Sequence, residues 1–177
     1  VGWFSLALLG VLWAFLGQEA RPAGWLPTQS LALLLAPTFM LGVSSALVTT
    51  DMFWVAALAN LAAAMLLGRH LLALWRQRQA LPWLVRFGLL ILGVHLLTAL
   101  AVAWPGVWQW SAGTQLRIFF LHNFLLGWVS STLLGVLLQR GRAHALPGEQ
   151  IMTFIWIGAV ATMLVALLGV GFLQFNP

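Results

Sequence analysis

Long apolar runs alternate along this chain with short segments that carry proline, glycine or charge. A helix rises ~1.5 Å per residue, so roughly 20 apolar residues cross the hydrocarbon core of a bilayer. The pattern predicts an all-α fold, a polytopic membrane helix bundle of about six transmembrane helices in a single domain, residues 1–177. The expected helices run from about Val1 to Leu16, Ser30 to Thr49, Met52 to Trp75, Leu84 to Trp104, Thr114 to Leu138 and Ile151 to Gln174.

The first of these runs is shorter than the others. The chain opens at Val1 without an initiator methionine, so truncation at the N-terminus is the expected reason for the short run. No basic region precedes it and no A-x-A site follows it, which favours a membrane helix over a signal peptide.

Composition supports a lipid environment. Hydrophobic residues make up 62% of the chain and charged residues 6%, whereas an ordinary soluble domain carries about 25% charged residues. The chain has no cysteine, which excludes disulfides and thiolate metal sites. Its basic residues are all arginines that lie between apolar runs, a pattern that indicates membrane orientation rather than nucleic-acid binding.

The arginines predict which loops face the cytoplasm. Odd-numbered loops are basic, while the second contains only Asp51 and the fourth is uncharged until Arg117. By the positive-inside rule the odd loops face the cytoplasm of a bacterial inner membrane, and both termini lie outside. The basic residues of the odd loops and their flanks are Arg21, Arg69, Arg76, Arg78, Arg86, Arg140 and Arg142.

Two histidines stand at matched depth in this topology. His95 lies about nine residues before the outer end of the fourth helix, and His122 about eight residues after the start of the fifth. At ~1.5 Å per residue both lie roughly 12–14 Å below the outer boundary. Helices joined by a short loop are antiparallel neighbours. The two imidazoles are therefore candidate metal ligands for one centre, and haem b is favoured because no cysteine or embedded carboxylate completes a zinc or di-iron set.

Three further residues are candidates for the haem site. Gly93 and Gly127 lie close in sequence to the histidines and would let a flat macrocycle approach the backbone. Arg117 lies toward the outer face, where a guanidinium can pair with a haem propionate.

A plain structural interpretation stays open for each residue. An intramembrane histidine can hydrogen-bond a neighbouring helix without any cofactor. Arg117 can anchor the helix at the interface, and Asn123 can bond a neighbouring helix. His70 is expected to extend to headgroups beside Arg69, and His144 to be solvated in a basic loop.

The run LRIFFLHNFLLGWVSSTLLGVLLQR, Leu116 to Arg140, resembles the second helix of haem-copper oxidase catalytic subunits, especially cbb3-like ones. The shared features are Arg-x-x-x-x-His, an aliphatic run and Gly-Trp. The resemblance implies that His122 ligates a low-spin haem. Those subunits have about twelve helices and several further histidines, so it implies a haem-binding relative or a fragment and not a terminal oxidase.

We therefore expect a membrane electron-transfer protein or redox-complex subunit that holds one b-type haem through His95 and His122. Its partners would be the lipid bilayer, other membrane subunits and a quinone. If it is an enzyme, it is part of a membrane oxidoreductase complex. The first alternative is a cofactor-free accessory or assembly subunit of a larger membrane complex. The second is a small transporter, suggested by the kink expected at Pro37 and a faint inverted repeat.

Overall fold

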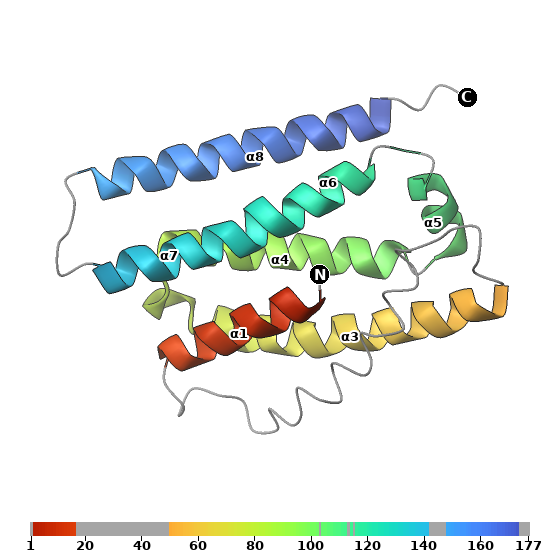
Figure 1. Cartoon of the computed structure of the whole chain (residues 1–177), viewed down its shortest axis with the longest axis horizontal. Coiled ribbons are helices and arrows are strands. Elements are labelled where there is room, and N and C mark those ends of the chain that lie inside the picture. The colour runs from red at the N-terminus through yellow and green to blue at the C-terminus, as the bar shows by residue number, and fades with distance from the viewer. Residues whose placement is uncertain are drawn as a thin grey trace.

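The structure is a computed structural model of the chain (Figure 1). The structure describes residues 2–16, 50–102, 104–112, 114, 116–141 and 148–173. The predicted second helix, Ser30 to Thr49 with Pro37, and the loop residue His144 lie outside these ranges, so the predictions made for them are not addressed.

Every regular element in the described ranges is helical, which confirms the predicted fold class. In chain order the elements are α1 (Gly2–Leu16), α3 (Thr50–Arg76), the short 3₁₀ helix η2 (Arg78–Ala80), α4 (Trp83–Val102), α5 (Pro105–Ala112), α6 (Leu116–His122), the π-helical segment η3 (Asn123–Ser130), α7 (Ser131–Arg140) and α8 (Glu149–Leu173).

Three described helical segments are long and apolar enough to cross a membrane, which is typical of an integral membrane protein. They are Trp83–Ala101, Ile118–Arg140 and Glu149–Gly171, with mean hydropathies of 2.0, 1.5 and 2.4. They correspond to the predicted fourth, fifth and sixth helices. Within α1 the apolar stretch Ala7–Leu16 is shorter than a span. The prediction of six spans is thus supported for three.

The predicted fourth loop is partly helical. The sequence from Trp104 to Gly113 reads as a loop, but Pro105–Ala112 forms α5. Pro105 is the first helical residue, a position where the missing N–H costs nothing and the fixed φ suits the helix. Proline at a helix start was therefore misinterpreted as a loop signal.

The predicted fifth helix is one continuous rod made of α6, η3 and α7, and its middle is wider than an α-helix. The Ser131 hydroxyl donates a hydrogen bond of 3.0 Å to the carbonyl of Leu126, five residues earlier. Trp156 of α8 donates its indole N–H to the same hydroxyl at 2.9 Å. This buried serine thus ties the π-helical segment to α8, and π-helical insertions are frequent at functional sites.

The helices pack as a bundle around α4 (Figure 1). Helix α4 contacts α3 on one side and the η3–α7 half of the rod on another, while α8 lies along the outside of α6. The main core lies between α1, α3, α4 and the rod, and its fully buried aromatic side chains are Trp13, Phe124 and Trp128. Asn60 of α3 donates a 2.7 Å hydrogen bond to the carbonyl of Ala99, which fixes α3 against α4.

Candidate functional site

His95 is buried in the contact between α4 and the rod, with 3% of its surface exposed. Its ring centroid lies 4.1 Å from that of Phe120 and 5.2 Å from that of Phe124, at interplanar angles of 33° and 42°. Its Nδ1 atom is buried and has no hydrogen-bond partner among the described residues. His95 therefore acts in this structure as an aromatic packing residue with one unsatisfied nitrogen.

His122 lies on another side of the rod. A helix turns by roughly 100° per residue, so positions 120 and 124 share a side and position 122 lies opposite them. His122 is partly exposed, and its Nδ1 lies 2.8 Å from the carbonyl oxygen of Ile118. Because a carbonyl only accepts, Nδ1 carries the proton and Nε2 carries the free lone pair. His95 of α4 therefore packs against one side of the rod, and His122 lies on the opposite side.

This arrangement does not fit a haem shared by the two histidines. An imidazole binds a metal ion end-on through a ring nitrogen at about 2 Å, so two axial histidines must point one nitrogen each at the same iron from opposite sides. His95 instead packs against the side of the rod that carries Phe120 and Phe124, and His122 lies on the opposite side.

The two candidate glycines serve helix packing. A Cβ atom added to Gly127 would collide with the side chain of Ile91 of α4, so Ile91 lies directly against this glycine. A Cβ added to Gly93 would lie 3.6 Å from Leu71 of α3, so Gly93 faces a different helix from Gly127. The backbone of Arg117 belongs to α6, and its side chain lies outside the part that the structure describes.

We call the interface between α4 and the rod the α4–rod seam. Most of its contacts follow one repeating pattern. Glycine on one helix meets a larger side chain on the other. Gly135 meets Val85, Gly88 meets Thr132 and Gly127 meets Ile91. Beyond these glycine contacts, His95 packs against Phe120 and Phe124. Small residues let membrane helices approach closely, so the seam is a packing interface along its whole length.

Sequence reasoning missed two buried polar groups in this region. The indole nitrogen of Trp128 and the hydroxyl of Thr132 are buried without a hydrogen-bond partner in the described ranges, as are both amide atoms of Asn123. Asn123 and Trp128 are five residues apart, a spacing that shares a face only in a widened, π-helical turn. The signal was therefore invisible as long as an ordinary α-helix was expected.

His70 also has a neighbour that the sequence did not indicate. Its ring lies 6.4 Å from that of Trp13 in an edge-on arrangement, and the residue is partly buried. This contact joins α3 to α1.

Comparisons with protein-family models, with curated proteins and with solved structures gave no match for this chain. A functional assignment therefore rests on the geometry of its own residues.

Proposed function

We propose that the chain is a cofactor-free accessory or assembly subunit of a larger membrane complex. The observation that carries this proposal is the α4–rod seam. At the level of both histidines the space between the two helices is filled by Ile91 against Gly127 and by the His95 ring against two phenylalanines. Side chains that fill an interface in this way support the packing of α4 against the rod, the role expected of a subunit without a cofactor.

The proposed partner is another membrane-spanning helix that packs on α8. In the α8 span 11% of residues are buried within the chain, compared with 39% and 44% in the other two spans. Its exposed side carries Gly158, Thr162 and Ala166 at four-residue intervals. Small residues at this spacing let two membrane helices pack closely. A Cβ atom added at Gly158 would meet no atom of the described residues within 4 Å, so the described helices leave this notch unfilled.

Substitutions on α8 test this role. Gly158→Leu fills the notch and should reduce the mass of the complex extracted from native membranes, without loss of the chain itself. Ala159→Leu is the matched control, because it adds a similar side chain about 100° around the helix on an equally exposed residue. Equal masses for wild type and both variants would reject α8 as the partner-binding side.

Six spans, a bacterial inner-membrane location, cytoplasmic odd loops and outward-facing termini are further parts of this proposal. They are supported by the distribution of the arginines, with Arg76, Arg78 and Arg140 at one end of the described spans.

A haem-binding electron-transfer subunit is the second candidate, in a form that uses His122 alone. Ligating histidines donate their second ring N–H to a carbonyl or carboxylate, which fixes the tautomer and the ring orientation. The Nδ1 contact of His122 with Ile118 matches that arrangement. In this version the second axial ligand comes from elsewhere, and His122→Ala removes haem absorbance while His95→Phe preserves it.

A further inference from the structure

The turn that joins α3 to α4, residues 76–86, carries three arginines, and we call it the η2 turn. Arg76 ends α3, Arg78 begins η2, and Arg86 lies one turn into α4. One span begins within this turn, at Trp83, so the η2 turn lies at a membrane–water boundary (Figure 1). Clusters of basic residues at such a boundary attract anionic phospholipid heads.

Arg86 is held in place by its own turn. Its Nε atom donates a hydrogen bond of 2.8 Å to the carbonyl of Leu81, and its Nη2 atom donates one of 3.0 Å to the carbonyl of Gln79. Its guanidinium carbon lies 4.8 Å from the centroid of the Trp83 ring, which is a cation–π contact. A side chain that is already ordered in this way loses little conformational entropy when it binds a ligand.

These bonds occupy one edge of the Arg86 guanidinium and leave another edge free. The group carries five N–H donors in a flat fork, and the two carbonyls use Nε and Nη2 on the same edge. The remaining edge, formed by Nη1 and the second N–H of Nη2, presents two parallel donors. Two parallel N–H groups match two oxygens of a phosphate, which is the anionic group of a phospholipid.

The two neighbouring arginines add positive charge beside this edge. Arg78 is exposed, its guanidinium carbon lies 5.5 Å from the centroid of the Trp75 ring, and its Nη1 donates to the carbonyl of Trp75 at 3.3 Å. Arg76 is exposed at the end of α3. Carbonyls and aromatic rings do not neutralise a guanidinium, so the η2 turn favours a head with net negative charge over a zwitterionic one.

An apolar strip continues from the η2 turn along the lipid-facing side of α4. Trp83, Leu90 and Leu97 follow one another at seven-residue intervals and expose 63%, 54% and 67% of their surfaces. Seven residues make about two helical turns, so these side chains share one side of α4. Arg86 comes three residues after Trp83 and four before Leu90, so it lies on this side as well. The strip is therefore placed to receive an acyl chain below the guanidinium.

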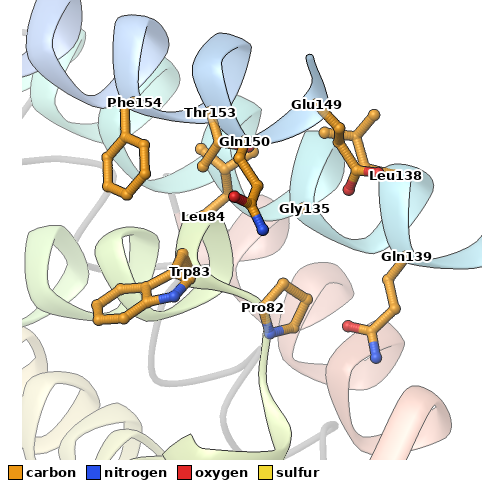
Figure 2. A pocket seen from close by; sticks show the side chains of 10 residues that line it. All are labelled: Pro82, Trp83, Leu84, Gly135, Leu138, Gln139, Glu149, Gln150, Thr153 and Phe154. Atoms are coloured by element: carbon orange, nitrogen blue, oxygen red, sulfur yellow. The ribbon is translucent and has the colours of Figure 1, made fainter. Parts of the chain in front are cut away.

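Trp83 also marks the limit of this surface. Its ring lies at the edge of a shallow hollow that opens to the surface between α4, α7 and α8 (Figure 2). Arg78 and Arg86 do not line that hollow. The arginines and the apolar strip thus form a separate surface on the η2 side of Trp83.

We propose that the η2 turn binds an anionic phospholipid, with its phosphate on the free edge of Arg86 and an acyl chain along Leu90 and Leu97. This site does not depend on the role proposed for α8 or for the histidines. Phosphatidylglycerol has the fitting head, because it carries a phosphate and no ammonium. Phosphatidylcholine is the discriminating competitor, because its quaternary ammonium adds a positive charge beside three arginines.

The test is native mass spectrometry of the full chain released from nanodiscs with equal amounts of phosphatidylglycerol and phosphatidylcholine. We expect wild type to retain the glycerol lipid about fivefold or more over the choline lipid, the factor that one basic residue near a membrane surface supplies. Arg86→Lys keeps the charge but removes the paired donors, and it should lower this ratio toward one. Arg140→Lys is the matched control, because it makes the same exchange at the end of α7, outside the η2 turn, and should leave the ratio unchanged.

Two further measurements complete the test. Arg78→Gln removes an exposed guanidinium that makes no bond to Arg86, so it reports on the site without disturbing the bonds of Arg86, and it should also lower the ratio. In lipid-free detergent, added phosphatidylglycerol should raise the unfolding temperature of wild type, whereas inorganic phosphate should not, because it has no acyl chain to cover the strip.

Four results would overturn the proposal. The first is equal retention of the two lipids by wild type. The second is a wild-type ratio in both Arg86→Lys and Arg78→Gln, which would place the lipid elsewhere. The third is an equal fall in Arg140→Lys, which would assign the effect to the whole boundary. The fourth is equal stabilisation by inorganic phosphate, which would make the turn a site for free phosphate.

Discussion

The ring centroid of His95 lies 4.1 Å from that of Phe120, with 33° between the ring planes. An imidazole covered by two phenylalanines contributes packing area first and hydrogen bonding second. Aromatic pairs in such offset arrangements contribute about 0.5–1.5 kcal/mol beyond the area that they bury. The same contact keeps the ring away from the opposite side of the rod, where His122 lies.

This relationship predicts how His95 tolerates substitution. His95→Phe keeps a ring between Phe120 and Phe124 and removes the unsatisfied Nδ1, so the free energy of unfolding should change by less than about 1.5 kcal/mol. His95→Ala leaves a cavity and should lower it by about 2–4 kcal/mol. Unfolding in mixed micelles measures both values. Equal destabilisation by the two substitutions would mean that the imidazole nitrogens, and not the ring, stabilise the fold.

The close contact between Gly127 and Ile91 predicts that two glycine-to-leucine substitutions differ in their effect on folding. Gly127→Leu places several methylene groups against Ile91 and should prevent folding into a stable bundle, measured as yield and as a monodisperse size-exclusion peak. Gly169→Leu is the control, because a Cβ atom there would meet none of the described residues within 4 Å. Two smaller substitutions test this contact by itself. Gly127→Ala alone should lower the stability of the bundle, and adding Ile91→Ala should restore part of that stability. If Ile91→Ala restored no stability, Gly127 and Ile91 would not be in contact at the α4–rod seam.

Topology is testable because the chain has no cysteine of its own. Single cysteines at Gln77 and Gly106 flank α4, the span that begins at Trp83 and ends at Ala101. A membrane-impermeant thiol reagent should label position 77 only from the cytoplasmic side and position 106 only from the outer side. Labelling of both from one side would show that α4 does not cross the membrane.

The positions of the helices were largely readable from the sequence. The fourth helix was expected from Leu84 to Trp104 and α4 spans Trp83–Val102, while the sixth was expected from Ile151 to Gln174 and α8 spans Glu149–Leu173. Apolar runs that end at proline, arginine or glutamate define such boundaries because charge and proline are poorly tolerated within a lipid-facing helix.

The sequence does not show which side of each helix faces the core. A helix that is apolar on all sides carries no stripe that identifies its inward face. Their equal depth in the membrane suggests that His95 and His122 meet. Whether they do depends on the direction in which each side chain leaves its helix. The π-helical turn adds to the difficulty, because it changes which residues share a face, and within it the Ser131 hydroxyl bonds the Leu126 carbonyl. No pattern of residue types predicts that bond.

The most direct measurement is the reduced-minus-oxidised absorbance spectrum of the chain purified with its native partners, for wild type, His95→Phe and His122→Ala. The central claim is that no iron is shared by His95 and His122, so no haem band should depend on both residues. If a band is present, it should persist in His95→Phe. A low-spin haem band in wild type that disappears in both variants, each of them folded, would contradict the account and restore the bis-histidine haem.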